Sequence, residues 1–329
     1  MKIGITFDTM EDYNGIDTSQ YCDFASLTSI SFLKKQFELA GFDVELIGTY
    51  EKLSNLIYSK KLSVDYIYNT AEGLQSRNRE GLVPALLEAN KIPYIGSDAY
   101  SLSLSLNKYH TKLLAKSIGI PTPPSTLIYL YDSVSEIKRK LQQLSFPIIV
   151  KPNYEGSSMG IYYTETAEDA YYKIRENQKV YRQEILCETY IDGMEITVPV
   201  IGMGKDTKAV GVVEFYYNNC KPLFLFTSNA KHYADIRCRE AILPLETINM
   251  LKKHSESIHN FLGCRDINRI DFRVSSKGDI YFLEANPLPA LDPEGSFCCA
   301  AKIQEISFPE LLKKIVKFAE KRYHDINYK

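Results

Sequence analysis

Apolar positions at the start of the chain switch repeatedly between the spacing of a strand and the spacing of a helix. Residues 27–40, for example, repeat apolar side chains at helical intervals and are followed by Gly41, a residue type that often ends a helix. A strand–helix–strand order is typical of a small parallel sheet covered by helices. We therefore expect strands at 2–7, 42–46 and 65–69 and helices at 27–40 and 81–90.

Two further blocks follow this unit. A helix expected at 107–118 ends at Gly119, and the prolines at 121, 123 and 124 indicate a hinge or a boundary. Strand patterns then dominate up to residue 203, and a third block begins near Gly202. The other expected elements are helices at 133–143, 167–177, 246–262 and 311–323, the last after the capping-box sequence Ser307-Phe308-Pro309-Glu310, and strands at 208–217, 267–275 and 279–286.

Composition limits the function classes. The 329 residues are 45% hydrophobic and 24% charged, enough for a large core and for two or three domains. A net charge of −2 offers no basic field for nucleic acid, and no apolar run approaches the roughly 20 residues of a membrane span. From these two observations we expect no nucleic-acid partner and no membrane. The chain begins directly as a strand, so we also expect no signal peptide.

The cysteines indicate a reducing compartment. There are seven, an odd number, and none forms a C-x-x-C pair. Reduced thiols in a cytoplasmic protein are the natural interpretation. The adjacent Cys298 and Cys299 are interpreted as packing residues, with a redox or metal role as the alternative.

Two expected strands near the C-terminus carry the first candidate chemistry. Arg269 and Asp271 lie in one strand, and Glu284 and Asn286 lie in the next. Residues two apart in a strand face the same side, so antiparallel pairing would bring three oxygen-bearing side chains together beside the guanidinium of Arg269. Such hard oxygens suit Mg²⁺ held against a nucleotide. The alternative is a solvated sheet face, with Asn286 merely opening a turn before Pro287.

The second group of candidate functional residues lies in a loop that contains glycine and serine. An apolar strand ends in Lys151, and the loop after it combines Gly156 and Gly160 with Ser157 and Ser158. Glycine lets backbone N–H groups turn toward an anion, and serine and lysine add O–H donors and charge, so the loop could cover phosphates. It is not a Walker loop, because the lysine precedes it. The alternative is an ordinary polar hairpin.

Taken in order, these motifs resemble those of a known family. The sequences Lys151-Pro152, Glu155-Gly156-Ser157-Ser158-x-Gly160, Arg269-Ile270-Asp271-Phe272 and Glu284-Ala285-Asn286-Pro287 resemble the ATP-grasp superfamily and, within it, the D-alanine:D-alanine ligase-like branch. The similarity runs through nearly the whole chain and includes 79–81, 96–97, 107–108 and 188–195. It implies an α/β ATP-grasp fold of three domains, with the nucleotide between the central and C-terminal domains. These would be an N-terminal Rossmann-like domain at 1–105, a central subdomain with the flap at 106–201, and a C-terminal subdomain with the metal site at 202–329.

The resemblance also implies roles for individual residues. ATP would be held by Lys108 and Lys151 at the phosphates, by the flap residues Glu155, Gly156, Ser157 and Ser158, by Glu188 and Tyr190 at the adenine, by Glu195 at the ribose, and by Lys231 at the terminal phosphate. Two Mg²⁺ ions, for which Mn²⁺ could substitute, would be held by Asp271, Glu284 and Asn286. Arg269, Lys231 and Ser157 would be catalytic, with Arg269 stabilising an oxyanion together with the backbone N–H near Ala290.

The implied reaction joins a carboxylate to an amine. Because this is uphill in water, the carboxylate is first converted to an acyl phosphate at the expense of ATP. Phosphoryl transfer requires positioning and charge neutralisation, which lysines and divalent metal supply. Since an acyl phosphate hydrolyses in water, a closing flap is expected.

Departures from the family pattern concern the substrates. The glutamate that holds the first amino group aligns with Cys22, beside Asp23, and the histidine after the third strand is replaced by the run 69–73, which contains Glu72. His232 replaces a loop tyrosine, as in vancomycin-resistance ligases that make D-alanyl-D-lactate. The run 287–296 is also altered, and the resemblance implies Ala290 as an oxyanion donor and Ser296 as a carboxylate ligand within it. The substrate candidates are Asp23, Glu72, His232, Ala290 and Ser296.

Three functions remain open at this stage. The first is a carboxylate–amine ligase with amino-acid or carboxylic-acid substrates other than two D-alanines. The second is a D-alanine:D-alanine or D-alanine:D-lactate ligase of cell-wall synthesis, and the third is a catalytically silent ATP-binding scaffold protein. The resemblance further suggests a homodimer.

Overall fold

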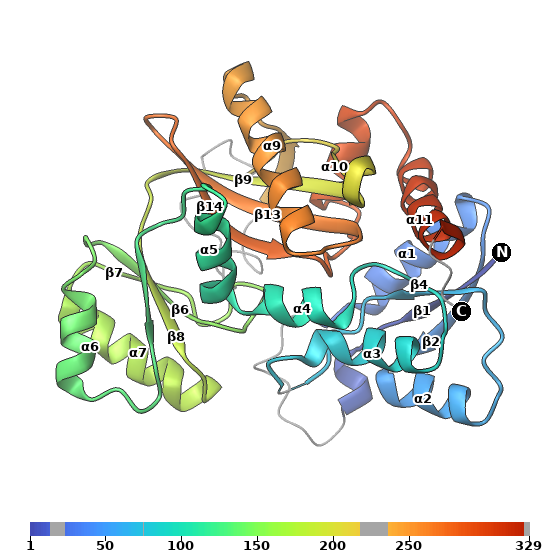
Figure 1. Ribbon diagram of the computed structural model, residues 1–329, viewed down its shortest axis with the longest axis horizontal. Coiled ribbons are helices and arrows are strands. Elements are labelled where there is room, and N and C mark those ends of the chain that lie inside the picture. The colour runs from blue at the N-terminus through green and yellow to red at the C-terminus, as the bar shows by residue number, and fades with distance from the viewer. Residues whose placement is uncertain (14–23, 75, 218–235, 326–329) are drawn as a thin grey trace.

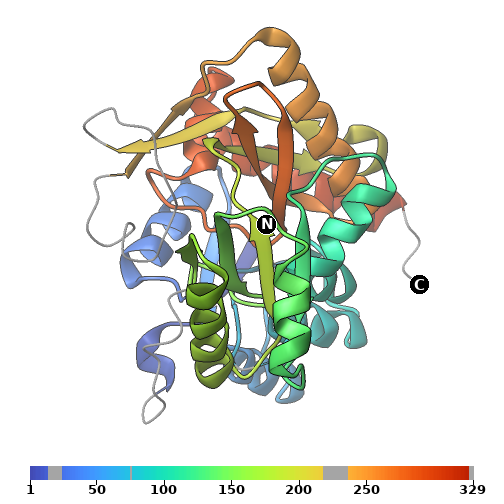
Figure 2. The same ribbon diagram turned by 90° about the vertical axis from the view of Figure 1, so that its left-hand side faces the viewer.

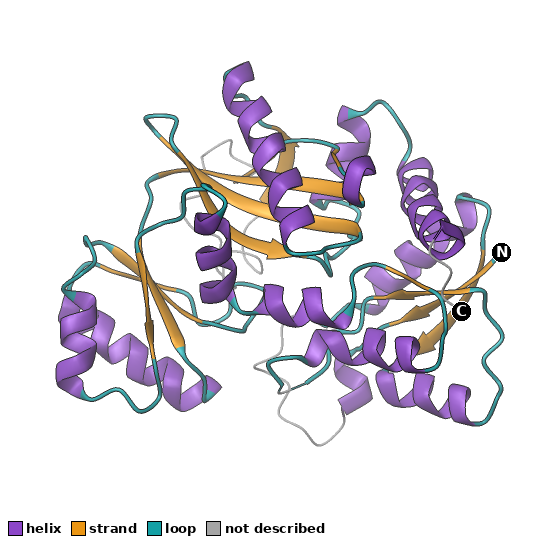
Figure 3. Cartoon of the chain, viewed as in Figure 1, coloured by secondary structure: helices purple, strands orange, loops and turns teal. Residues whose placement is uncertain are grey.

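The computed structural model describes residues 1–13, 24–74, 76–217 and 236–325, which form three sheets with their helices (Figure 1). All three parts contain both helices and strands, as expected for an α/β chain (Figure 3). Within these described ranges, no helix is both long enough and apolar enough to cross a membrane.

The first sheet is parallel, with strand order β2-β1-β3-β4. Its inner positions are fully buried at Ile3, Ile5 and Ile67. Helix α1 begins after Ser26, whose side chain accepts a hydrogen bond from the Ser29 N–H, and Gly41 at φ +92° follows its end. The predicted strand–helix–strand unit is confirmed. The elements are β1 Lys2–Thr6, α1 Leu27–Leu39, β2 Asp43–Gly48, α2 Tyr50–Tyr58, β3 Tyr66–Asn69, α3 Leu82–Ala89 and β4 Tyr94–Ile95.

Two consecutive helices, α4 Ala99–Leu106 and α5 Lys108–Ser117, lead from this block to a second, antiparallel sheet of order β5-β8-β6-β7. Both helices of the second block lie on the face of this sheet that is turned away from the first block (Figures 1 and 2). Its elements are β5 Ser125–Ile128, α6 Val134–Leu141, β6 Ile148–Pro152, β7 Tyr162–Thr164, α7 Ala167–Tyr181 and β8 Ile185–Thr189.

The third sheet has the order β12-β11-β9-β13-β14, with β10 paired to β9. The expected strand at 208–217 is two strands, β10 and β11. The domain boundary predicted between residues 201 and 202 falls at the end of β9. Because all strands that pair with β9 belong to the third sheet, we propose a boundary at 190–193 instead. The elements are β9 Gly193–Gly202, β10 Lys208–Ala209, β11 Val213–Tyr217, β12 Ile236–Glu240, α9 Leu245–Phe261, β13 Asp266–Ser275, β14 Ile280–Asn286, α10 Ser296–Ile303 and α11 Phe308–Asp325.

The last helix, α11, joins the third block to the first. It begins at the predicted capping box, where the Glu310 side chain accepts from Ser307 N at 2.7 Å and Glu310 N donates back to Ser307 Oγ at 3.4 Å. Near its end, the buried Arg322 donates to Asp266 at 2.5 Å and to the carbonyl of Tyr94 at 2.8 Å. The same Asp266 carboxylate accepts from the Gly96 N–H. The first and third blocks therefore share one buried polar junction.

Candidate active site

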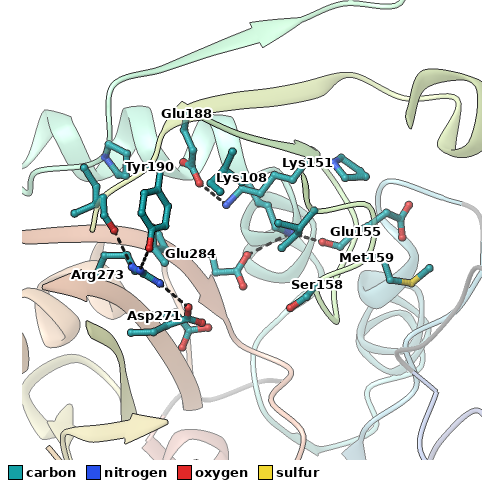
Figure 4. A pocket seen from close by; sticks show the side chains of 18 of the residues that line it. Lys108, Lys151, Glu155, Ser158, Met159, Glu188, Tyr190, Asp271, Arg273 and Glu284 are labelled. Carbon is teal, nitrogen blue, oxygen red and sulfur yellow. Dashed lines mark hydrogen bonds and ion pairs between the residues drawn. The ribbon is translucent and has the colours of Figure 1, made fainter. Parts of the chain in front are cut away.

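A cavity lies between the second and third sheets (Figure 4). One wall comes from α5, β6, β8 and the loop after β6, and the opposite wall comes from β9, β13 and β14. Apolar side chains such as Ile149, Ile161 and Leu283 line it between the charged groups. The residues predicted for the site that line this cavity are Lys108, Lys151, Glu155, Gly156, Ser158, Glu188, Tyr190, Glu195, Asp271 and Glu284.

The cationic wall starts at α5. Lys108 donates from Nζ to the Glu155 carbonyl at 2.5 Å and lies 3.4 Å from Glu284 Oε2 on the opposite wall. Asn153 holds this end of the helix, because its Oδ1 accepts from Tyr109 N at 2.9 Å and its carbonyl accepts from Lys108 N at 3.2 Å. The end of β6 and the start of α5 are thereby locked together, which places Lys108 beside the flap.

A buried group of one carboxylate and two lysines forms part of that wall. Glu188 contacts Lys151 at 2.6 Å and Lys112 at 2.8 Å, and Lys112 is fully buried. Burial would raise the pKa of Glu188, but the two lysines lower it to about 2. Burial lowers the pKa of Lys112 to about 8, against the opposing effect of Glu188. Lys112 was not predicted, because a lysine within an amphipathic helix gives no signal of its own.

The acidic wall has the predicted pairing. Asp271 lies opposite Glu284, and Arg269 lies opposite Asn286, in the antiparallel register of β13 and β14. Asn286 Nδ2 donates to Asp271 Oδ2 at 2.9 Å, and Arg269 Nη2 reaches the same oxygen at 2.9 Å. Thr197 Oγ1 donates to the other carboxylate oxygen at 2.8 Å. The three oxygen-bearing side chains converge beside Arg269, so the alternative of a solvated sheet face is wrong for Asp271, which is only 7% exposed.

These side chains fit a hard divalent cation. Burial opposes the ionisation of Glu284, yet Lys108 and Lys151 bring its pKa down to about 2, so the carboxylate is charged at neutral pH. The donors are two carboxylates and one amide oxygen, the ligand type that Mg²⁺ prefers. The described residues contain no group of three His, Cys, Asp or Glu side chains able to hold a metal, and the predicted set here combines two carboxylates with the amide of Asn286.

The flap joins β6 and β7, which pair as an antiparallel hairpin. The hairpin interpretation and the flap interpretation are thus compatible, because Gly156, Ser158 and Met159 of this hairpin loop line the cavity. Ser157 and Ser158 have left-handed φ values of 46° and 60°. Ser157 is not among the lining residues.

The flap is fixed at both of its ends. Arg79 donates to the Tyr154 carbonyl at 2.9 Å, and Gln183 donates to the Glu155 carboxylate at 2.6 Å. At the other end, Asn177 Nδ2 donates to the Gly160 carbonyl at 2.8 Å. The conformation of the loop over the cavity is therefore set by residues outside it.

Arg273, which was not predicted, forms part of the wall that carries Tyr190 and Glu195. Its guanidinium donates to Tyr190 Oη at 2.9 Å and contacts Glu195 Oε2 at 3.2 Å. Burial raises the pKa of Glu195, while Arg273 opposes that rise. The sequence offered one signal for this residue, since position 273 lies on the same strand face as 269 and 271.

The predicted substrate residues that the structure describes do not line the cavity. Ala290 is exposed in the loop after β14, and Ser296 is buried as the first residue of α10, but neither lines the cavity. Glu72 follows β3, next to Gly73, whose N–H donates to the buried carboxylate of Asp8 at 2.8 Å. Cys22, Asp23, Lys231 and His232 lie outside the described residues. Cys298 and Cys299 are buried in α10, as the packing interpretation expected.

Comparison with known proteins gives consistent results. Residues 114–317 match the family model described as the D-ala D-ala ligase C-terminus. A D-alanine–D-alanine ligase of Aquifex aeolicus is 32% identical, over 72% of this chain and 77% of the relative. In structure, the D-alanine–D-alanine ligase of Bacillus anthracis matches with a TM-score of 0.78 at 22% identity, over 99% of both chains. The VanG D-Ala:D-Ser ligase of Enterococcus faecalis matches with a TM-score of 0.77 at 20% identity, over 97% and 99% of the two chains.

Proposed function

The chain belongs to the D-alanine–D-alanine ligase family of ATP-dependent carbon–nitrogen ligases, and from that premise we propose that at least one of its substrates is not D-alanine. The reaction would be the condensation of a carboxylate with an amine through an acyl phosphate. The observation that supports the proposed reaction is the 3.4 Å contact between Lys108 and Glu284, because it brings a lysine proposed for phosphate binding close to a carboxylate proposed for metal binding across one cavity.

The first half-reaction would be phosphoryl transfer. An oxygen of the substrate carboxylate attacks the terminal phosphorus of ATP, the bond to the bridging oxygen breaks, and ADP leaves. Lys108 and Lys151 hold the phosphates and balance their charge, which is most of what this transfer requires of a protein. The flap loop at 155–160 excludes water from the acyl phosphate.

The second half-reaction would form the amide. The amine nitrogen attacks the acyl carbon, a tetrahedral oxyanion forms, and inorganic phosphate leaves as the nitrogen loses a proton. Arg269 remains charged and donates in a planar fork, which suits it to stabilise the oxyanion. Its contact with Asp271 at 2.9 Å fixes the guanidinium on the cavity side of β13.

Asp271, Glu284 and Asn286 would hold the divalent metal, which when bound supplies charge neutralisation at the phosphates. We extend the proposal to two Mg²⁺ ions replaceable by Mn²⁺, to a homodimer, and to a cytoplasmic location. Metal titration by calorimetry and light scattering of the purified protein test the ion number and the dimer.

The substrate proposal is supported by the residues that depart from the family pattern. Glu72 lies in the region after β3 where a histidine is expected, and Pro287-Leu288-Pro289 changes the loop after β14. The VanG relative is named as a D-Ala:D-Ser ligase, so a protein of this fold accepts a second substrate other than D-alanine. Glu72, Asp23, His232, Ala290 and Ser296 remain the candidate substrate residues.

The experiment is a coupled assay for ADP and phosphate release over a panel of D- and L-amino acids and hydroxy acids, taken in pairs. We expect release that depends on both partners, with a pair other than two D-alanines preferred. Preference for two D-alanines would restore the cell-wall ligase alternative. Nucleotide binding without release for any pair would favour the silent scaffold protein.

A further inference from the structure

Arg273 lines the cavity beside Tyr190 (Figure 4), and Glu195 lines the same cavity. Arg273 follows Asp271 by two residues on β13, so both side chains project from the same face of the strand. Its side chain is only 4% exposed. The guanidinium is therefore held inside the site and does not lie on its rim.

Arg273 contacts the segment between β8 and β9 at two points and β9 itself at a third. Nε donates to the Ile191 carbonyl at 3.1 Å, Nη2 donates to Tyr190 Oη at 2.9 Å, and Nη1 lies 3.2 Å from Glu195 Oε2. The guanidinium carbon also lies 5.1 Å from the centre of the Tyr190 ring. One planar group thus fixes a backbone carbonyl, an aromatic ring and a carboxylate relative to one another.

The backbone alone does not fix these side chains. Arg273 and Glu195 are direct partners in the β13–β9 ladder, and a Cβ at Gly193 would lie 2.0 Å from the Val274 carbonyl, so the segment passes tightly against β13. That pairing places the Cα atoms but leaves the side-chain torsions of Tyr190 and Glu195 open. Glu195 also experiences the negative charges of Asp271 and Glu284, so its carboxylate needs a cation nearby.

We propose that Arg273 is a positioning residue that aligns Glu195 and Tyr190 with the nucleotide and thereby sets the preference for ribonucleotides over 2′-deoxyribonucleotides. This inference rests on the proposed function. A carboxylate can accept from the 2′- and 3′-hydroxyls of one ribose only if its plane faces both, and a charge-assisted bond of this kind is among the stronger ones. Losing the 2′-hydroxyl should then weaken binding by about tenfold.

The experiment compares ATP with 2′-deoxy-ATP in the full chain. Arg273→Met keeps the length of the side chain and removes its charge and donors, while Arg273→Lys keeps the charge and loses the fork. The control is Arg175→Met on α7, where the guanidinium lies 5.5 Å from the Tyr171 ring centre. KM and kcat are measured with both nucleotides, and dissociation constants are measured by calorimetry, so that one result does not depend on turnover.

We expect the parent and Arg175→Met to bind ATP about tenfold more tightly than 2′-deoxy-ATP. In Arg273→Met the two constants should come within about threefold of each other, mainly because ATP binds more weakly, and Arg273→Lys should be intermediate. A general loss of stability would weaken both nucleotides equally and leave the ratio unchanged.

An unchanged ratio in both Arg273 variants, or a parent that turns over both nucleotides equally well, overturns the inference and leaves the proposed function intact. A parent that binds neither nucleotide overturns the proposed function, and the inference falls with it. If Arg273→Met does not fold, the ratio in Arg273→Lys decides alone.

Discussion

Asp271 and Glu284 face each other as direct partners in the β13–β14 ladder. The two carboxylates reach the cavity from neighbouring strands, where Arg269 and Lys108 supply the opposite charge at 2.9 Å and 3.4 Å. This relationship supports the proposal that the acidic wall holds a cation.

Glu284→Gln should abolish turnover without unfolding the protein. The substitution keeps the volume and removes one negative charge from the set of oxygens that would hold metal, so we expect kcat to fall by about 100-fold or more. The measurement is amine-dependent ADP release beside a thermal unfolding curve. Glu176→Gln, on the exposed face of α7, is the matched control. Kinetics equal to those of the parent would show that Glu284 is no metal ligand.

Gly160→Ala tests the flap. Gly160 has φ +64°, and an added Cβ would lie 2.7 Å from a Tyr181 ring atom and 2.9 Å from Pro152 Cδ. We expect a higher KM for ATP, because the loop must move to relieve the contact. Gly278→Ala is the control, since it has φ +88° but nothing within 4 Å of the added Cβ. Equal effects of the two substitutions on KM would mean that backbone strain, not flap position, is measured.

The lowered pKa of Glu188 predicts that the protein loses stability in acid. Its folded pKa is about 2, below its ordinary value of 4.5, because Lys112 and Lys151 favour the carboxylate although burial opposes it. A carboxyl group with a lowered folded pKa stabilises the protein fully above its unfolded pKa and loses that contribution as the pH falls toward 2. The free energy of unfolding of the parent should therefore decrease between about pH 4.5 and 2 more steeply than that of Glu188→Gln. Parallel curves would contradict this prediction.

The lowered pKa of Lys112 predicts that its contribution to stability changes in the alkaline range. Burial lowers its folded pKa to about 8 from 10.5, so between these values the unfolded chain binds more protons than the folded one. The contribution of Lys112 to the free energy of unfolding should then increase as the pH rises from about 8 to 10.5. Urea titrations of the parent and Lys112→Met at several pH values measure it. At pH 7, Lys112→Met should cost about 3 kcal/mol, because Glu188 loses one of its two cationic partners.

The parts of the site that could be predicted depend on local spacing. Asp271 and Glu284 could be paired in advance because their strands are joined by a short turn and the side-chain period of a strand is two. Lys112 could not be identified in this way, since its partner Glu188 lies on a distant segment. Arg273 shares the strand face of Asp271, but its partner Glu195 is brought beside it only by the folded sheet. A lone lysine in a helix looks like any solvated residue in sequence.

The same reasoning explains what was missed in the fold. Helix α10, Ser296–Ile303, is apolar almost throughout and buried on nearly all sides, so it carries no helical alternation of polar and apolar positions. The boundary was predicted after residue 201 because β9 continues the strand pattern of the second block. Its membership of the third sheet depends on hydrogen bonds to β11 and β13, which no local pattern reveals.

The junction of Arg322 with Asp266 and Tyr94 has a consequence for any attempt to divide this protein. The helix that carries Arg322 follows the whole of the third sheet along the chain, yet it packs against the first sheet. Truncation before residue 308 should expose the apolar flank of that sheet, and the N-terminal piece expressed alone should aggregate. Adding the missing helix as a separate peptide should restore solubility only if it retains the arginine.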